Sequence, residues 1–483
     1  MIRSLEKKSH NQRRSIIRLW GVFALLVAGV CAFAIASRSV DAGSSHSSKL
    51  GRAERTNHRI SMHPELAGQP ALTAPFFATI TVDRTDDTAA ASACTAALND
   101  CSLRGAVAFA NLNPGTTISV PAGTYQLNIP GGATEGFSGN NSIGDLDITA
   151  NNTTITGAGA ASTIIQQTAP NDRVIEVNPN LLASFNFSIS DVTITGGKET
   201  TAVGGGGIIS GSINNTVSIT NCIISGNSAT GTGTFGGGGI SHEGGSLTIT
   251  GTTFSGNSTS GSGGGLGYTA GDPLIRTPSS GTLTVTGSTF SGNTANSAAA
   301  GGGGADLFNF NGGLGTYNIS SSTFSGNSAP NLNGRGGAIV VESGPLTLTT
   351  SALTSNTAGL TGGAISSSGS ASVTYSRLVG NSVPNPSNGL TLFTSNGTFS
   401  ADDNWWGVNT GPGANDFTST TGSIMPASYL QLRISASPSQ VCSGGTAAVS
   451  ADIKQRNTGG LLTTELNGLP TFTPVFGVTP PTL

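Results

Sequence analysis

Short segments in which apolar and polar residues alternate recur along the chain after residue 200. Examples are Leu247-Thr248-Ile249-Thr250, Leu283-Thr284-Val285-Thr286 and Leu346-Thr347-Leu348-Thr349. A period of two residues predicts β-strands with one buried and one exposed face. Each segment follows a Gly-rich block that ends in an apolar residue and precedes an element similar to Phe-Ser-Gly-Asn. The pattern therefore predicts three short strands per repeat and no helix of useful length.

The repeats are marked most clearly by one asparagine each. These residues are Asn227, Asn257, Asn293, Asn327, Asn356 and Asn381, separated by 30, 36, 34, 29 and 25 residues. A propeller blade needs about 40–50 residues and four antiparallel strands. A solenoid tolerates irregular spacing because insertions can leave it at a corner. We therefore predict an all-β fold, a parallel β-helix with three strands per coil, right-handed by the general crossover preference.

This fold gives each repeated residue type a structural role. Phe254, Phe290 and Phe324 are expected to lie in a shared dry interior. Alternate Thr and Ser side chains are expected to point outward. Asparagine tolerates the left-handed conformation and bonds to nearby backbone, so the six asparagines are expected to form a ladder at one corner. We interpret that ladder as structural and not as a binding site.

The first 76 residues differ in charge from the rest. They hold 11 basic and 4 acidic residues, whereas residues 77–483 hold 10 and 20, which together give the net charge of −3. Arg13, Arg14 and Arg18 precede an apolar run over 19–36, so 1–36 reads as a secretory signal peptide. A twin-arginine signal and an uncleaved anchor remain alternatives. Residues 37–76 are predicted to be a disordered linker. The acidic remainder argues against nucleic acid as a partner, and no other run is long enough to span a membrane.

The segment 77–128 is predicted to cap the N-terminal end of the β-helix, which then covers 129–425. Cys94 and Cys101 would form a disulfide in an exported protein. Apolar residues from Leu103 to Ala110 fall on one stripe and predict a short helix over 102–111. Such a helix would cover the open strand edges and the apolar interior.

Two parts of the chain resemble known families of exported bacterial proteins. Cys101-Ser102-Leu103-Arg104-Gly105-Ala106 resembles the Cys-Ser-Leu-Arg-Glu-Ala signature of a surface-protein domain, whose usual sequel is similar to 118–125 and 144–148. The repeats resemble those of polymorphic outer-membrane proteins. Together the resemblances span about residues 78–425 and imply pectate-lyase-like right-handed β-helices. Gly105 replaces the signature Glu and would remove a capping-box bond, so we expect a less stable helix.

The end of the β-helix carries a motif that allows two interpretations. Asp402 and Asp403 precede Trp405 and Trp406. These four residues are the candidate ligand-facing group if the indoles stack on sugars. Alternatively, the indoles cap the last apolar layer, which we favour. Residues 426–483 resemble the start of an immunoglobulin-like domain and are too few for a full sandwich of ~100 residues.

Catalytic residues are hard to assign in this sequence. Basic side chains are sparse over 130–425, and the acidic ones are scattered, with Asp145/Asp147 and Asp402/Asp403 as the close pairs. We interpret His242-Glu243 as a solvated turn and not a catalytic dyad. The insertions 268–280 and 306–314 are the loops on which function would be expected, but we favour the alternative that they are tolerated insertions without a function. No catalytic residue, metal or cofactor is predicted.

Two functions fit these observations. The first is a secreted or outer-surface β-helix protein with a non-catalytic role in adhesion or envelope structure, with glycans or a host or neighbouring cell surface as partners. The alternative is a polysaccharide lyase or glycoside hydrolase of the pectate-lyase-like type, which would need clustered acidic residues.

Overall fold

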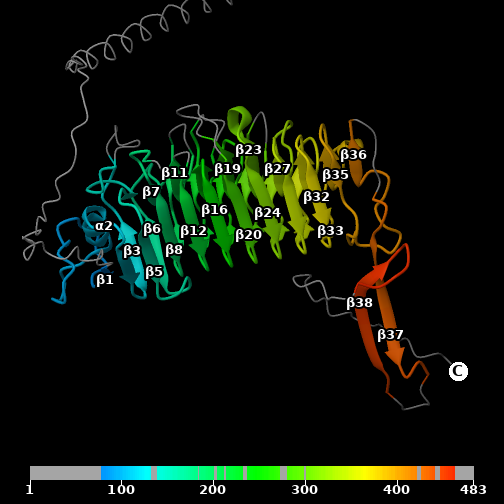
Figure 1. Cartoon of the computed structure of the whole chain (residues 1–483), viewed down its shortest axis with the longest axis horizontal. Helices are drawn as coiled ribbons and strands as arrows, with labels where there is room; N and C mark the ends of the chain where they lie inside the picture. The colour runs from blue at the N-terminus through cyan, green and yellow to red at the C-terminus, as the bar shows by residue number, and fades with distance from the viewer. Residues whose placement is uncertain are drawn as a thin grey trace, which may run out of the picture. The chain divides into compact units, whose positions relative to one another are not determined.

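The structure, a computed structural model, describes residues 78–131, 139–182, 184–200, 204–211, 214–231, 236–271, 280–297, 301–420, 426–440 and 446–462. The predicted signal peptide and linker lie outside these residues. Over the described part, the chain forms four parallel sheets, one antiparallel hairpin and one α-helix (Figure 1). This arrangement confirms the all-β fold and the parallel β-helix.

The chain passes repeatedly through these sheets in a fixed order, which we number sheets 1 to 4. The coils that contain β6 and β33 have no strand in sheet 3. Sheet 1 has eleven strands: β1 (Thr79–Thr81), β2 (Thr117–Val120), β5 (Thr153–Gly157), β8 (Asn186–Ser190), β12 (Thr216–Thr220), β16 (Ser246–Thr250), β20 (Thr282–Thr286), β24 (Thr316–Ser320), β28 (Leu346–Thr349), β32 (Ala371–Thr374) and β35 (Phe399–Ser400). Sheet 2 has nine: β3 (Gly123–Leu127), β6 (Thr163–Gln167), β9 (Thr193–Thr195), β13 (Ile223–Ser225), β17 (Thr253–Ser255), β21 (Thr289–Ser291), β25 (Thr323–Ser325), β29 (Ala352–Thr354) and β33 (Arg377–Val379).

The other two parallel sheets complete the coil. Sheet 3 has six two-residue strands: β10 (Lys198–Glu199), β14 (Ser228–Ala229), β18 (Ser258–Thr259), β22 (Thr294–Ala295), β26 (Ser328–Ala329) and β30 (Thr357–Ala358). Sheet 4 has ten: β4 (Leu146–Ile148), β7 (Ile175–Val177), β11 (Ile208–Gly211), β15 (Ile240–Glu243), β19 (Leu266–Ala270), β23 (Ala305–Asn309), β27 (Ile339–Val341), β31 (Ile365–Ser367), β34 (Leu392–Thr394) and β36 (Phe417–Ser419). Short 3-10 helices, η2 (Phe310–Gly312) and η3 (Pro386–Asn388), lie in two connections.

Sheets 1, 2 and 4 correspond to the three predicted strands, and sheet 3 was not predicted. Its strands directly follow the asparagine corner, as in Ser228-Ala229 after Asn227. Two residues are too short to show an alternating pattern, which explains why sequence periodicity does not reveal them. Sheets 1 and 2 also begin within the segment 77–128, because β1, β2 and β3 already belong to them. The β-helix therefore starts before residue 129.

The interior is built from identical residues stacked in register. Phe254 pairs with Phe290, and Phe290 with Phe324, in successive strands of sheet 2. The ring centroids are 4.4 and 4.6 Å apart, and the planes are parallel within 3°. All three side chains are fully buried. Parallel strands spaced about 4.8 Å apart impose this face-to-face stacking on any aromatic column inside the coil.

The six asparagines form a hydrogen-bonded ladder at the corner between sheets 2 and 3. In Asn257, both the backbone N–H and the side-chain amide donate to Oδ1 of Asn293, at 3.0 and 2.9 Å. The same side-chain amide donates to the carbonyl of Ile224. This pattern continues from Asn227 to Asn381, and all six side chains are buried. The ladder therefore satisfies polar groups that the tight corner would otherwise leave without partners.

A second ladder of hydroxyl groups lies at the corner between sheets 1 and 2. Each backbone N–H at this corner donates to the side-chain oxygen in the next coil, as from Ser288 to Ser322 at 3.2 Å. Each hydroxyl in turn donates to the carbonyl two residues earlier in its own coil. The column consists of Thr252, Ser288, Ser322, Ser351 and Ser376, and ends at Asn404. The sequence signal was a small hydroxyl residue two positions before each Phe or Leu of sheet 2.

The N-terminal end is closed by α2 (Leu103–Leu112), which lies against the first strands of the sheets (Figure 1). Asn111 connects the helix to β4, the terminal strand of sheet 4. Its side-chain amide donates to the carbonyl of Asp147 at 2.7 Å, and its Oδ1 accepts from the N–H of Thr149 at 2.8 Å. The side chain thus substitutes for a neighbouring strand at an exposed sheet edge.

Candidate functional site

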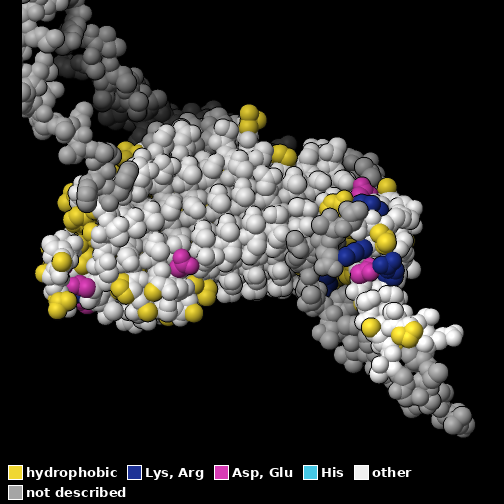
Figure 2. Space-filling view, turned by 60° about the horizontal axis from the view of Figure 1, so that its bottom comes forward, with side chains coloured by type: hydrophobic (Ala, Val, Ile, Leu, Met, Phe, Trp, Pro, Cys, Tyr) yellow, Lys and Arg dark blue, Asp and Glu magenta, His cyan; other side chains and the backbone are white. Residues whose placement is uncertain are grey.

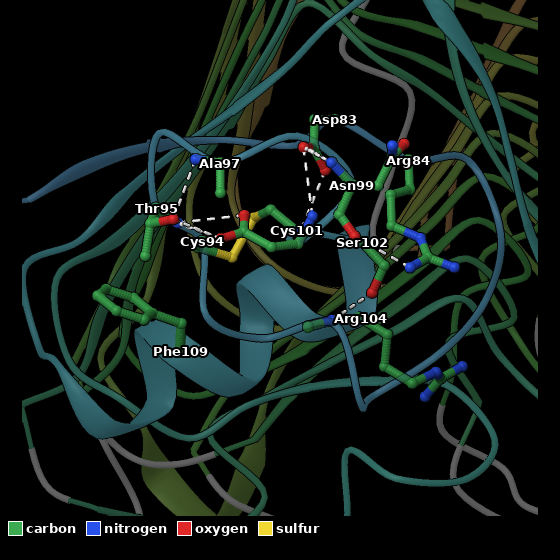
Figure 3. Close-up of a disulfide and its surroundings, with 12 residues drawn as sticks. Asp83, Arg84, Cys94, Thr95, Ala97, Asn99, Cys101, Ser102, Arg104 and Phe109 are labelled. Carbon is green, nitrogen blue, oxygen red and sulfur yellow. Dashed lines mark hydrogen bonds between the residues drawn. A yellow bond between two sulfur atoms is a disulfide. The ribbon is translucent and has the colours of Figure 1, made fainter.

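The disulfide between Cys94 and Cys101 closes a short loop beside α2 (Figure 3). Ser102 caps the helix, because its hydroxyl oxygen accepts from the N–H of Gly105 at 2.9 Å. A Cβ atom on Gly105 would lie 1.9 Å from the carbonyl oxygen of Ala91. The same carbonyl accepts from the N–H of Ser102. Glycine is therefore required here by a close backbone contact, which the glutamate of the family signature could not accommodate.

Arg104 is fully buried and joins four segments of the N-terminal end. Its Nε donates to Asp87 at 2.5 Å. Its Nη1 and Nη2 donate to the carbonyls of Asp145 and Gly144, at 2.7 and 2.6 Å. Asp87 also accepts from the backbone N–H groups of 128 and 129. This guanidinium is fully hydrogen-bonded, as a buried charge must be, and it fixes the loop that enters β4.

The loop that enters β4 and the strand itself place two acidic residues, Asp145 and Asp147, in an enclosed cluster. Asp147 pairs with Glu176 in the register of β4 and β7, and Asp145 lies two residues earlier. Their carboxylates each offer an oxygen within 4.8 Å of the others, and all three are buried. The expectation that the acidic residues are scattered is therefore wrong at this position, because the stacking of coils brings together residues 29 positions apart.

Arg173 lies among these carboxylates. Its guanidinium is 3.7 Å from Asp145 and 3.4 Å from Glu176, and it also donates to Glu199. The acidic residues Asp172 and Glu199 are buried as well. One arginine side chain therefore forms ion pairs with three members of a group of five buried acidic residues. Burial raises the pKa of Asp145 well above its usual value and that of Asp147 to about 6.

The four predicted ligand-facing residues near the C-terminal end are buried or hydrogen-bonded within the protein. Trp405 and Trp406 are 8% and 6% exposed. Trp405 pairs with Arg377 of β33, which places Trp406 after Leu378 in the interior column. Trp406 belongs to the continuous core. Trp406 thus caps the last apolar layer, whereas Trp405 lies beside Arg377. The burial of both indoles does not fit the sugar-stacking interpretation.

Asp402 and Asp403 accept hydrogen bonds from the hairpin and from the segment that leads into it. The hairpin consists of β37 (Leu430–Ser437) and β38 (Ala448–Arg456). Asp402 accepts from the N–H of Ala427 at 2.7 Å. Asp403 accepts two bonds from Arg456, at 2.9 and 2.8 Å. Burial raises the pKa of Asp403, but the bonds from Arg456 and Ser428 outweigh this, so the net pKa is lowered. The antiparallel hairpin is the described part of the predicted immunoglobulin-like segment.

His242 lies inside the β-helix, so its interpretation as a solvated turn residue is wrong. The residue belongs to β15 and is fully buried. Its ring stacks on Tyr268 at 5.5 Å, and neither ring nitrogen has a hydrogen-bond partner in the described part of the chain. Burial lowers the pKa of His242 to about 3. The imidazole is therefore neutral and enclosed, which is unsuited to proton transfer with an external substrate.

The outer face of sheet 1 carries an ordered array of hydroxyl and amide groups. One row, with one residue per coil, consists of Ser218, Thr248, Thr284, Asn318, Thr347 and Ser372. Thr248, Asn318 and Thr347 are exposed. Figure 2 shows a face of the molecule on which side chains along the middle are predominantly neither hydrophobic nor charged.

An open hollow of about 370 Å³ lies near the C-terminal coils. It is lined by Pro330, Thr357, Ala358, Gly359, Ser382, Val383 and Pro384. These lining residues include no titratable side chain, so this hollow offers no acid, base or metal ligand.

Comparison with known proteins found no match among family models, curated proteins or solved structures. Within the described residues, no helix is both long and apolar enough to cross a membrane.

Proposed function

We propose that this chain is a secreted or outer-surface β-helix protein that binds glycans without turning them over, in adhesion or envelope structure. The observation that carries the proposal is the hydroxyl array on sheet 1. Its members recur once per strand, about 4.8 Å apart, and the array spans at least six consecutive coils. A periodic polar surface of this kind suits a repeating polymer with many hydroxyl groups.

The distribution of acidic groups favours binding over hydrolysis or lyase chemistry. The carboxylates that come together at Asp145, Asp147 and Glu176 are enclosed, so a polysaccharide cannot reach them. Those of Asp402 and Asp403 already accept hydrogen bonds from the protein. A glycosidase needs a pair of carboxylates that flank an accessible bond, and these groups do not provide it.

Location outside the cell is supported by two features. The Cys94–Cys101 disulfide fits an oxidising compartment. The first 36 residues have the pattern of a signal peptide. The resemblance to exported surface-protein domains agrees with both.

The proposal is tested by incubating the purified protein with pectin, alginate and host glycans. Bound polymer is measured by co-sedimentation, and products are measured as unsaturated or reducing ends. We expect binding without products. Release of either kind of end would contradict the proposal and favour the enzyme.

A pair of double variants tests the surface itself. Thr248→Glu with Thr284→Glu places repelling charges on sheet 1, and it should abolish binding of acidic polymers. Thr253→Glu with Thr289→Glu places the same charges on sheet 2 and serves as the matched control. Equal binding by the two double variants would show that sheet 1 is not the glycan-binding surface.

A further inference from the structure

The enclosed acidic cluster at the N-terminal end has an unusual position. In β4 and β7, the residues beside Asp147 and Glu176 are apolar members of the core. Since side chains alternate between the two sides of a strand, Asp147 and Glu176 point away from the interior of the coil. They are nevertheless fully buried. The carboxylates therefore occupy an enclosed space on the outer side of sheet 4.

The described residues do not balance the charges in this space. Asp145, Asp147, Asp172, Glu176 and Glu199 are acidic and buried. The guanidinium of Arg173 forms ion pairs with three of them, Asp145, Glu176 and Glu199. Arg104, the next guanidinium, is already paired with Asp87. A buried charge needs a counter-charge or a hydrogen-bond donor. Arg173 cannot supply enough of either.

The carboxylate of Asp147 faces that of Glu176 and lacks a hydrogen-bond donor. Asp147 is 0% exposed, and neither of its carboxylate oxygens accepts a hydrogen bond within the described residues. Oδ1 of Asp145 is likewise buried and without a hydrogen bond there. Both groups face the position where Glu176 also offers an oxygen within 4.8 Å. One oxygen from each of the three carboxylates therefore lies close enough to the other two to share a cation.

The donor set selects the kind of ligand. All the groups are carboxylate oxygens, which suit hard divalent cations, and no thiolate or imidazole is present among them. Three carboxylates can supply up to six oxygens in mono- or bidentate form, which suits the large, flexible coordination shell of calcium. Magnesium prefers to keep several waters and a strict octahedron. We propose that Asp145, Asp147 and Glu176 form a calcium-binding site that joins the first coils of the β-helix.

The surrounding structure positions these ligands. Arg104 holds the carbonyls of Gly144 and Asp145, and Asn111 holds the carbonyl of Asp147. A bound cation would thus connect β4, β7 and the capping helix. We expect calcium to stabilise the N-terminal end of the solenoid and to have no part in glycan turnover.

Calcium binding is measured on the full chain after treatment with EDTA, by isothermal titration with calcium chloride. Thermal unfolding is followed in EDTA and in excess calcium. We expect one saturable site and a higher Tm in calcium. The absence of saturable binding at millimolar calcium, with equal Tm in both buffers, would overturn the proposal.

Variants separate metal binding from a general effect on folding. Asp147→Asn and Glu176→Gln should each weaken binding by about tenfold or more, because even outer-shell changes cost that much. Both should fold in EDTA, because they lower the repulsion. Asp306→Asn is the matched control, since Asp306 is a buried carboxylate in the same outward row of sheet 4, and it should bind calcium normally.

Two results would contradict the assignment. One is unchanged calcium affinity in Asp147→Asn. The other is displacement of calcium by an equal concentration of magnesium, which would show that the site does not select the larger ion.

Discussion

The side-chain amide of Asn257 donates to Oδ1 of Asn293 at 2.9 Å, although the two residues are 36 positions apart. The same bond joins Asn293 to Asn327 at 2.9 Å, across 34 residues. Insertions of different length therefore leave the corner unchanged. This constancy shows that the coils are held in register by the ladder, while the connections from sheet 3 to sheet 4 and, above all, from sheet 4 to sheet 1 absorb the variation in length.

Removing one member of the ladder should be costly. Asn293→Ala would remove the acceptor of the backbone N–H of Asn257 and the donor to the carbonyl of Phe254, both in a buried place. The side-chain amide of Asn257 would keep its bond to Ile224 and lose the one to residue 293. Each such group costs about 1–3 kcal/mol, so we expect a loss of about 2–5 kcal/mol in the free energy of unfolding, measured with urea. Asn318→Ala, at an exposed position of β24, is the control and should change it by ~0.5 kcal/mol or less. Similar values for both variants would contradict a structural ladder.

The phenylalanine column predicts a graded response. Phe290→Ala opens a cavity between two stacked rings and should cost about 3–5 kcal/mol. Phe290→Leu should cost less than half of that, because Leu353 and Leu378 already occupy the same column further along. Leu314→Ala changes a largely exposed residue and should have little effect. The account would fail if Phe290→Ala were as mild as Leu314→Ala in chemical denaturation.

Gly105→Ala and Ala108→Gly are opposite exchanges in α2, but both should lower the stability of the protein, each for a different reason. Alanine normally favours a helix over glycine by ~1 kcal/mol. Gly105→Ala should nevertheless destabilise the protein, since its Cβ would meet the carbonyl of Ala91. Ala108→Gly, in the same helix, should destabilise it by ~1 kcal/mol through helix propensity alone. A rise in Tm for Gly105→Ala would disprove the close contact.

His242 should make stability depend on pH. Its pKa is about 3 in the folded protein and about 6.5 in an unfolded chain. The unfolded state therefore binds the proton more readily, so the contribution of His242 is intact above about pH 6.5 and is lost as pH falls towards 3. The loss is about 1.4 kcal/mol per pH unit within this window.

The measurement compares His242→Phe with the unmodified chain between pH 7 and 5. Titration of Asp147, whose pKa is about 6, affects both proteins and cancels in the comparison. As the pH is lowered, the free energy of unfolding of the unmodified chain should fall faster than that of His242→Phe, by about 1.4 kcal/mol per pH unit. Parallel pH profiles would show that His242 is accessible to water in the folded state.

The repeated features were predictable from the sequence because they depend on period alone. The columns of Asn257 and Phe254 repeat in every coil, and a shared interior follows from that. His242 could have been placed inside, since it lies two residues after Ile240 in β15 and therefore on the same side of the strand. The Glu-Gly-Gly that follows suggested a turn instead.

The features that were missed depend on contacts between different segments. Glu176 meets Asp147 because β4 and β7 pair in a register that no asparagine marks in the first coils. The similar patterns of Asp145-Leu146-Asp147-Ile148 and 174–177, Val-Ile-Glu-Val, were the available signal. The need for Gly105 arises from Ala91, a loop residue whose position no periodicity specifies.

The most direct test of the stacked coils is a set of distances along sheet 1. Ser188, Asn318 and Ser372 lie in one outward row, with Asn318 four strands and Ser372 six strands from Ser188. Spin labels are introduced in pairs after replacing the cysteines outside the disulfide, and distances are measured by pulsed electron resonance. At about 4.8 Å per strand, we predict backbone separations of about 19 and 29 Å. A Ser188–Ser372 distance equal to or shorter than Ser188–Asn318 would contradict the parallel stack.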